Sequence, residues 1–452
     1  MKFSKYNFVY EDNGVLYLYN SKNAAFVKMS DKDDIEKFKE LQKNNNLSLD
    51  NPMVKAFYNR GYIVDDDVDE YKEVQKNIKK IYADREKALT LMIYTTEQCN
   101  FRCVYCCEEH VDKRLSDENW ENVLNFIDKR IEQDKIQVVR ISFFGGEPLL
   151  EAKKILEFSK KLTDLKKKYK KLVIDNDITT NGYLLTPKLY DELVKFNVLT
   201  FQITVDGFAD THNKMRPRVD GEGTWDKIID NLKYINSQKD KAVVVVRTNF
   251  NATNEKTVKD FIKWAKNILN SQKFTFMAHP VLKFSDNVAQ EQVADESKKQ
   301  KVKSDTDYEE RSVNQYRNPL RNIGYTCKCS MKNYYVIKVN GRVSKCEQAY
   351  GDGFDVGYLD ETGIHFDMDE NLWNEGYETE NCKDCYIYPL CAARGCPVRK
   401  VTDPERKDCI LNTLKDGESV MDNIINAISS GALDASKSKV IKKVDPKEKR
   451  KN

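Results

Sequence analysis

The apolar positions of the chain follow a different pattern in each successive region, and the first region predicts a small α+β unit. Within residues 1–85, short apolar runs flank an Asn-Gly pair at 13–14, which is typical of a β-hairpin. The run AAFVKM predicts a third strand, and helices are expected near 34–42 and 52–59. Such a unit has a sheet edge that could accept a peptide strand, and simple packing support is the alternative role.

From residue 88 to about residue 282, β-rich runs alternate with amphipathic stretches. The runs are LTLMIYT, VVRISFF, LVIDNDIT, LTFQITV, AVVVVRTNF and FTFMAHPV. Between the first two, Trp120, Val123 and Ile127 recur at helical spacing behind a Ser116 cap. Six strand–helix units predict an α/β core over residues 86–285, with a parallel sheet that is either doubly wound or curved into a partial (β/α)6 barrel.

The ends of these strands are expected to carry the chemistry. Four segments of unusual composition follow them: the cysteine loop that begins at Cys99, Gly145–Pro148, Thr179–Gly182 and Asp206–Gly207. In a doubly wound sheet or a barrel, active sites form beyond the carboxyl ends of parallel strands. The four segments are therefore predicted to converge on one site.

The remainder of the chain divides into three further parts. Residues 286–325 are polar with few apolar anchors, which predicts a linker or an insertion. Residues 326–415 contain eight of the twelve cysteines and are expected to form a metal-rich domain. Residues 416–452 predict a C-terminal helix and a basic tail, whose simplest interpretation is a solvated end.

Composition and charge exclude several classes of function. No apolar run approaches the length that spans a bilayer, and the first residues, MKFSKYNFVY, lack the apolar core of a secretory signal. The 75 basic and 72 acidic residues nearly cancel, so we expect no nucleic-acid partner. These features predict a cytoplasmic protein of several domains without a membrane partner.

Cysteines in a reducing compartment favour metal binding or reactive thiols over disulfides. Cys99, Cys103 and Cys106 lie close enough on one loop to hold three irons of a [4Fe–4S] cluster and to leave the fourth iron open for a ligand. Structural zinc is the alternative, with His110 completing a Cys3His tetrahedron. The position of the loop after the first strand favours a catalytic centre over a closed zinc site.

The segment CNFRCVYC resembles the CxxxCxxC signature of the radical S-adenosylmethionine (SAM) superfamily, including the aromatic Tyr105 before the last cysteine. FGGEP at 144–148 resembles the GGEP motif of that family. The resemblance implies that Cys99, Cys103 and Cys106 carry a [4Fe–4S] cluster whose free iron binds SAM. It implies contacts of Gly145, Gly146 and Glu147 with the SAM amine, and makes Thr180, Asn181 and Asp206 candidates for contacts with its sugar or carboxylate. Structural capping is the alternative for each of the last three.

The C-terminal cysteines resemble the SPASM extension of radical SAM enzymes, which holds two auxiliary [4Fe–4S] clusters. That resemblance implies an outer cluster on Cys382, Cys385, Cys391 and Cys409, and an inner cluster on Cys346 and Cys396 with Cys327, Cys329 or both. The chain departs from the family pattern in the x4 spacing from Cys391 to Cys396 and in the Cys-x-Cys pair at 327–329. The inner cluster could therefore have three cysteine ligands and an open iron. Zinc knuckles are the alternative, and Cys107 is left over.

The N-terminal unit resembles the peptide chaperone of pyrroloquinoline quinone biosynthesis, which takes a leader peptide as an added strand. Together these resemblances imply a radical SAM peptide maturase, similar to thioether-forming sactipeptide and ranthipeptide synthases. Its partners would be a precursor peptide with a leader and a reductant such as flavodoxin or ferredoxin. Its product would be a thioether or a carbon–carbon cross-link.

Two alternatives stay open at this point. One is an anaerobic sulfatase-maturating enzyme, which forms formylglycine, and the other is a zinc-stabilised peptide-binding scaffold without catalysis. The N-terminal unit counts against the first, because that chemistry would not require leader capture. No general base can be assigned, since acidic residues near the strand ends are too many to rank.

Overall fold

The computed structural model describes most of the chain in eight stretches. These are residues 1–45, 47–282, 290–295, 327–347, 352–374, 376, 378–393 and 396–403. Most of the expected linker at 286–325, the expected tail at 416–452 and Cys409 lie outside the described residues. Among the described residues, no helix combines the length and the apolar character needed to cross a membrane.

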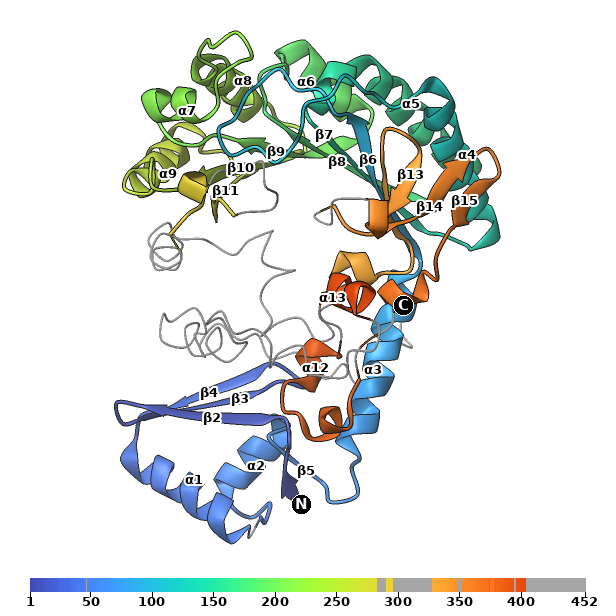
Figure 1. The fold of residues 1–452 in the computed structure, drawn as a ribbon. Coiled ribbons are helices and arrows are strands. Elements are labelled where there is room, and N and C mark those ends of the chain that lie inside the picture. The colour runs from blue at the N-terminus through green and yellow to red at the C-terminus, as the bar shows by residue number, and fades with distance from the viewer. Residues whose placement is uncertain are drawn as a thin grey trace.

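The N-terminal unit is a three-stranded antiparallel sheet with two helices on one face (Figure 1). Its elements are β2 (Asn7–Asp12), β3 (Val15–Asn20), β4 (Ala25–Met29), α1 (Lys32–Asn44) and α2 (Pro52–Asn59), and β1 (Lys2–Phe3) pairs with β5 (Ile63–Val64) beside them. Leu16 and Leu18 of the sheet are buried with Phe38 of α1. Asn13 and Gly14 both have positive φ, so the predicted hairpin turn and third strand are confirmed.

Helix α3 (Glu70–Arg85) was not anticipated from the sequence. It runs from the N-terminal unit toward the parallel sheet and passes beside α12 (Tyr388–Cys391) (Figure 1). Its apolar residues Val74 and Ile78 are buried against Tyr6 and Tyr388. Tyr71 and Tyr82 join Val74 and Ile78 in this cluster at helical spacing, so the apolar pattern of this helix was present in the sequence.

The six predicted β-rich runs form parallel strands of one curved sheet, with helices on its outer face (Figure 1). The strands are β6 (Ala88–Thr96), β7 (Val138–Gly145), β8 (Val173–Thr180), β9 (Val198–Thr204), β10 (Val243–Phe250) and β11 (Phe274–Pro280). The connecting helices are α4 (Asp117–Gln133), η1 (Pro148–Glu151), α5 (Ala152–Lys168), α6 (Pro187–Lys195), α7 (Ala209–Met215), α8 (Trp225–Ser237) and α9 (Val258–Ile268). The fold is the partial parallel barrel rather than the doubly wound sheet, because helices cover one face only.

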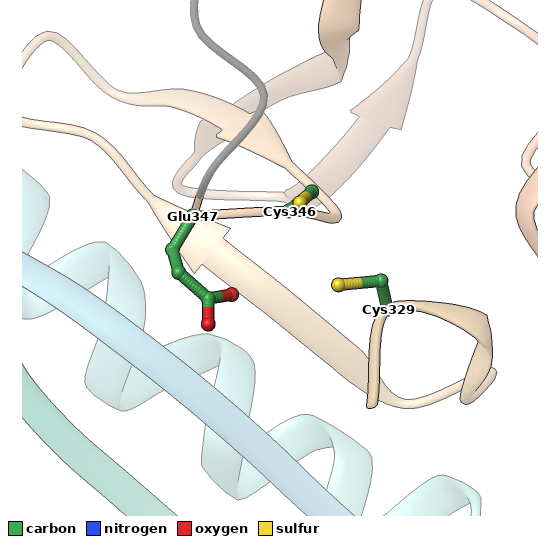
Figure 2. Close-up of side chains that lie close together, drawn as sticks. All are labelled: Cys329, Cys346 and Glu347. Carbon is green, nitrogen blue, oxygen red and sulfur yellow. The ribbon is translucent and has the colours of Figure 1, made fainter. Parts of the chain in front are cut away.

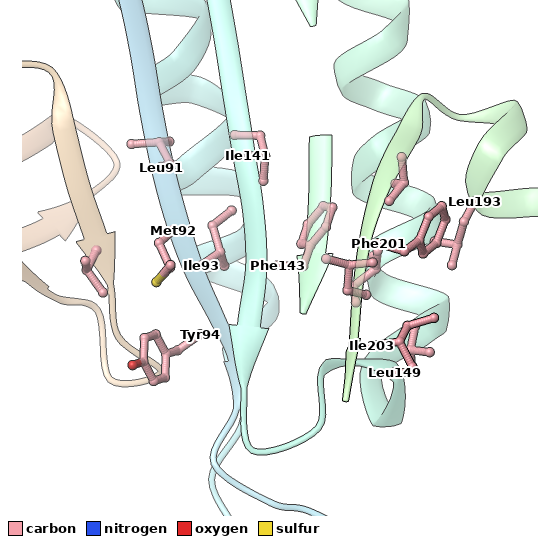
Figure 3. Close-up of a cluster of buried hydrophobic side chains, with 14 of the residues drawn as sticks. Leu91, Met92, Ile93, Tyr94, Ile141, Phe143, Leu149, Leu193, Phe201 and Ile203 are labelled. Carbon is pink, nitrogen blue, oxygen red and sulfur yellow. The ribbon is translucent and has the colours of Figure 1, made fainter. Parts of the chain in front are cut away.

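The hydrophobic core lies between this sheet and its helices (Figure 3). Successive residues of β6 point to opposite faces, so Ile93 faces one side of the strand while Met92 and Tyr94 lie on the other. Phe143 of β7 and Phe201 of β9 are fully buried on the face that the helices cover, where they pack against aromatic side chains of α4, α5 and α6. The Ser116 cap of α4 is present, with its hydroxyl accepting from the Asn119 amide.

The cysteine-rich C-terminal region continues the same sheet instead of building one of its own. Strand β12 (Tyr334–Ile337) pairs in parallel with β6, and β13 (Arg342–Ser344), β14 (Asp355–Asp360) and β15 (Gly363–Phe366) follow as antiparallel neighbours. The short helices of this region are η3 (Lys328–Ser330), η4 (Asp352–Phe354), α11 (Asn371–Asn374), η5 (Glu380–Asp384), α12 and α13 (Pro397–Thr402), and η2 (Gln290–Gln292) precedes them. Cys329 and Cys346, which flank β12 and β13, therefore lie near the first barrel strand.

Candidate active site

The cysteine loop after β6 is clamped by the segment that follows α7. The amides of Arg102 and Val104 donate to the carbonyls of Pro217 (2.9 Å) and Met215 (3.0 Å). These bonds join a loop at the first strand to a loop at the fourth, so both strand ends must be in place before the loop takes this shape. The predicted convergence of strand-end segments is confirmed.

Burial makes the thiols of this loop weak acids. It raises the pKa of Cys99 and Cys106 to about 12, and it also raises the pKa of Cys103. Buried thiolates are costly unless a positive charge compensates them. Three such thiols on one loop suit ligands of a metal centre, since a bound cation deprotonates the thiols that coordinate it.

Tyr105, between the second and third thiols, is held by a buried polar network. Its hydroxyl donates to the carboxylate of Asp206, and it accepts from Arg216 Nη1 (2.6 Å) and Asn249 Nδ2 (3.0 Å). Asp206 is fully buried, and it also accepts from the backbone amide of Asn249 (2.7 Å). Asp206 is a candidate for a contact with SAM, with a structural role as the alternative, and in this structure its carboxylate holds Tyr105. The guanidinium of Arg216 in turn lies 5.6 Å from the centre of the Phe101 ring.

Gly145 and Gly146 bring two backbones into close contact where β7 ends. The Gly146 amide donates to the Thr96 carbonyl (2.9 Å), and a Cβ on Gly146 would lie 2.2 Å from the Gln98 carbonyl oxygen. A Cβ on Gly145 would meet the Thr96 carbonyl at the same distance, 2.2 Å, and Gly145 has φ of +129°. Only glycine fits either position, which explains the Gly-Gly pair on backbone grounds.

Glu147 follows the glycine pair at the end of β7. Its side chain is fully buried and accepts hydrogen bonds from Thr180 Oγ1 (2.6 Å), the Asn181 amide (2.7 Å) and the Leu149 amide (3.0 Å). Burial raises its pKa, although these three bonds act in the opposite direction. Its carboxylate therefore joins the ends of β7 and β8, and the predicted contact of this residue with the SAM amine stays a prediction.

A cavity of about 600 Å³ opens beside the cysteine loop at the carboxyl ends of the strands. All three loop cysteines, both glycines, Thr180 and Asn181 line it. The side-chain amide of Asn181 also donates to Asn100 (2.8 Å) and lies 4.0 Å from Cys99 Sγ. The volume of the cavity falls in the range of small-molecule sites, so a ligand the size of SAM fits beside the thiols.

Further polar residues line the cavity that sequence reasoning did not select. Ser142 of β7 is one of them, and the others come in pairs two residues apart from successive strands: Asp177 and Thr179, Gln202 and Thr204, and Arg247 and Asn249. A spacing of two places side chains on the same face of a strand. Polar residues at alternate positions of otherwise apolar parallel strands were the signal that could have revealed this wall.

Within the part of the chain that the structure describes, three carboxyl groups line the cavity, and these are the candidates for a catalytic proton acceptor. Burial raises the pKa of Asp177 to about 6 and that of Glu108 to about 7. Asp177 accepts from the Ser142 hydroxyl at 2.6 Å. Glu347, from the C-terminal region, is the third.

His110 and Cys107 of the cysteine loop also line this cavity. His110 Nε2 lies 3.4 Å from Cys106 Sγ, a contact that the zinc alternative also requires. Among the described residues, however, the loop thiols and His110 form no group of three ligand atoms within 4.8 Å of one another, so the closed tetrahedral zinc site is not assembled here.

Two of the expected inner-cluster cysteines lie together in the described residues. Cys329 and Cys346 have their sulfur atoms within 4.8 Å of each other and of a carboxylate oxygen of Glu347 (Figure 2). Cys327 is next to this group, and its hydrogen bond with Cys329 lowers the pKa of the Cys327 thiol. Cys396 is exposed and does not belong to the group.

The described cysteines expected at the outer cluster lie against the N-terminal unit. Cys382 and Cys385 pack on the buried cluster that contains Tyr6 and Val74. Cys391 ends α12 in the same segment. Lys5 forms an ion pair with Asp384 (3.6 Å), so this segment and the N-terminal unit share charged as well as apolar contacts.

Comparisons with known proteins agree with this geometry. Residues 93–265 match the model of the radical SAM superfamily. The cysteine-type anaerobic sulfatase-maturating enzyme of Clostridium novyi is 25% identical over 349 residues, which cover 69% of this chain and 88% of that enzyme. Radical SAM cyclopropyl synthase TigE of Paramaledivibacter caminithermalis is 30% identical over 167 residues, which cover 33% of this chain and 34% of the synthase. This chain thus spans about a third of the length of TigE.

The fold has a known relative as well. The structure of native anSMEcpe with bound AdoMet and the Cp18Cys peptide superposes with a TM-score of 0.55 at 20% identity. The superposition covers 76% of this chain and 99% of that one. At this identity the likeness shows a shared fold, which extends well beyond the residues that match the superfamily model.

Proposed function

This chain carries a radical SAM domain, and on that premise we propose that it is a peptide maturase which forms a thioether or a carbon–carbon cross-link in a ribosomally made peptide. The superfamily implies a [4Fe–4S] cluster and SAM, which together would supply a 5′-deoxyadenosyl radical that removes a hydrogen atom from a substrate carbon. In this proposal residues 1–85 bind the leader, 86–285 form the catalytic core and 326–415 carry two auxiliary clusters. Flavodoxin or ferredoxin would act as the reductant.

The observation that carries this proposal is the position of the loop thiols on the cavity wall. Cys99, Cys103 and Cys106 all line a space of about 600 Å³ that also receives groups from six strands and from the C-terminal region. A structural zinc site has four protein ligands and needs no adjoining cavity, whereas a centre that binds SAM and a peptide side chain requires one.

The chain's own residues orient the components in this proposal. Gly145 and Gly146 let the backbone approach the bound SAM, and Asn181 presents its amide beside Cys99. Glu147 and Asp206 are positioning residues, because both carboxylates are buried and hold neighbouring site groups in place. Asp177 is a cavity carboxyl that can accept a proton near neutral pH, because burial raises its pKa to about 6.

The sheet of the N-terminal unit supports leader binding by strand addition. β4 is an outer strand that, among the described residues, pairs only with β3. An unpaired strand edge offers main-chain donors and acceptors to an extended peptide. Exposed Lys28 lies on this strand, where it could contact an acidic leader.

Sulfatase maturation is the second candidate, because the 25% identical relative is matched over 88% of its own length. That protein's name describes an enzyme acting on a cysteine-type sulfatase. The two candidates differ in product: a cross-link removes hydrogen atoms and keeps the sulfur, while formylglycine formation replaces the cysteine sulfur with oxygen.

Mass spectrometry distinguishes these products directly. A cysteine-containing precursor peptide encoded near this gene should be incubated with reconstituted enzyme, SAM and dithionite, beside a short sulfatase-motif peptide as the matched control. The proposal expects hydrogen loss in the precursor without loss of sulfur, and no change in the control. Conversion of the sulfatase peptide to its aldehyde, with the precursor unchanged, would establish the second candidate instead.

A further inference from the structure

The inner cysteine pair has a neighbour that the cysteine pattern does not include. Glu347 follows Cys346 directly, and one of its carboxylate oxygens lies within 4.8 Å of both Cys329 Sγ and Cys346 Sγ (Figure 2). We propose that Glu347 is an oxygen ligand of the metal centre held by Cys329 and Cys346. This inference rests on the proposed function, because that proposal supplies the auxiliary centre.

The two turns that carry these donors are fixed to each other independently of any metal. Lys345, which is fully buried, donates from Nζ to the carbonyls of Met331 (2.7 Å) and Lys332 (3.2 Å). This ties the turn after β13 to the turn that contains Cys329. The juxtaposition of Cys329, Cys346 and Glu347 is therefore built into the backbone around them.

The carboxylate of Glu347 is oriented from both sides and keeps room for a metal. Its Oε1 lies 2.7 Å from Lys328 Nζ, and its Oε2 accepts from the Tyr334 hydroxyl at 3.0 Å. A carboxylate has about four lone-pair sites, so two remain after these contacts.

The position of Glu347 also predicts a special role for the metal that it binds. Its side chain is 20% exposed and lines the active-site cavity, as does Lys328. Oxygen ligands bind iron of a thiolate centre less strongly than sulfur ligands do, so the oxygen-bound position is the one that can exchange. The exchangeable position of the inner centre would thus face the place where a peptide thiol arrives.

Cys327 and Glu347 are the candidates for the third and fourth ligands of the inner centre. Neither Cys327 nor Cys396 belongs to the group of three, but Cys327 is hydrogen-bonded to Cys329, whereas Cys396 is exposed. If Cys327 joined the centre, three thiols and one carboxylate would complete four positions without Cys396. The unusual Cys-x-Cys pair would then supply two of the four ligands.

The experiment isolates the auxiliary centres in a chain with Cys99, Cys103 and Cys106 all changed to Ala, reconstituted with ⁵⁷Fe and sulfide. Into this chain we would introduce Glu347→Gln, with the exposed Glu361→Gln of the same region as the matched control. Iron and zinc content, Mössbauer spectra and the rate of iron removal by a chelator are measured. Glu347→Cys provides the test of rescue by a sulfur ligand.

The proposal expects one iron with the raised isomer shift of oxygen ligation in the parent, and its loss in Glu347→Gln. Chelators should remove inner-centre iron at least about tenfold faster from this variant, and Glu347→Cys should restore retention. Addition of 2-mercaptoethanol should change the parent spectrum and leave that of Glu347→Cys unchanged. Identical spectra and removal rates for the parent and Glu347→Gln would overturn the inference.

Other outcomes separate this inference from the proposed function. Stoichiometric zinc that is lost in Glu347→Gln would support the ligand and refute the iron–sulfur assignment of the inner centre. Iron that is retained in full by Glu347→Gln with an all-sulfur spectrum would refute the ligand and leave the auxiliary cluster in place. A parent chain without bound metal would overturn both.

Discussion

The two cysteine-rich regions of this molecule place their thiols in different ways. At 99–106, three thiols come from one loop of eight residues, and a neighbouring loop holds that loop by backbone hydrogen bonds. In the C-terminal region, Cys329 and Cys346 come from separate turns, and Cys382 and Cys385 pack against residues near the other end of the chain. The first arrangement is local in sequence, and the second depends on long-range contacts.

This difference has a consequence for how each region responds to change. The cysteine loop should lose its function when its ligands are removed and otherwise leave the molecule intact, because sheet and helices surround it. The C-terminal segment joins the barrel to the N-terminal unit through Tyr388, Lys5 and their neighbours. Loss of its ligands should therefore also disturb the unit proposed to bind the peptide.

The largest effect is expected when Cys99, Cys103 and Cys106 are changed together to Ala. Production of 5′-deoxyadenosine should fall to background, because no ligand set remains for the iron that binds SAM. Iron content should fall from about twelve to about eight per chain, since each [4Fe–4S] centre has its own thiolates. Cys107→Ala is the matched control and should stay active, and cleavage of SAM by the triple variant would refute the assignment of the cluster.

The next effect concerns the C-terminal region. Cys382→Ala combined with Cys385→Ala should remove about four further irons and stop peptide modification, while SAM cleavage without peptide continues. Because these cysteines pack beside Tyr6, limited proteolysis should also cut faster around residues 60–70. A chain that loses this iron but keeps the wild-type rates of proteolysis and peptide modification would show that the segment with Cys382 and Cys385 does not stabilise the N-terminal unit.

The third prediction concerns the buried ion pair of Arg216 and Asp206, which holds Tyr105 of the cysteine loop. Arg216→Met leaves the fully buried Asp206 without its cation, which should lower the free energy of unfolding by about 3–5 kcal/mol. The exposed pair Arg140–Asp175 is the matched control, and Arg140→Met should cost less than about 1 kcal/mol. Thermal unfolding at one pH measures both, and equal losses would show that burial of the Arg216 pair has no special importance.

The smallest effect is a pH dependence on the cavity wall. Burial raises the pKa of Asp177 to about 6, with Asp175 adding to the shift and Lys328 opposing it. The charged form of Asp177 is thus disfavoured in the folded state. The resulting loss of folding free energy grows as the pH rises from the pKa of Asp177 in the unfolded chain toward its folded-state pKa of about 6. Asp177→Asn should raise the free energy of unfolding by up to about 3 kcal/mol at pH 8 and by less at pH 5. A stabilisation that is the same at both pH values would contradict this origin.

Sequence patterns were sufficient for the core and insufficient for its surroundings. The six strands and the Ser116-capped helix followed from apolar periodicity, because each of these elements buries its apolar face between the sheet and the helices that cover it. The packing of helix α3 and the pairing of β12 with β6 did not follow, since the groups that bury them come from distant parts of the chain. Periodicity reports that a face is apolar and does not identify what covers it.

The sequence by itself determined the superfamily motifs, because the spacing of Cys99, Cys103 and Cys106 and the Gly-Gly pair meet chemical needs within short segments. Only the tertiary structure decided which groups face the cavity. Glu147 and Asp206 stand at strand ends as expected, yet their carboxylates turn inward to Thr180 and Tyr105, since a buried charge must find donors nearby. Glu347 lies far from the loop thiols in sequence and reaches their cavity, because pairing of β12 with β6 brings the two cysteine regions to the same edge of the sheet.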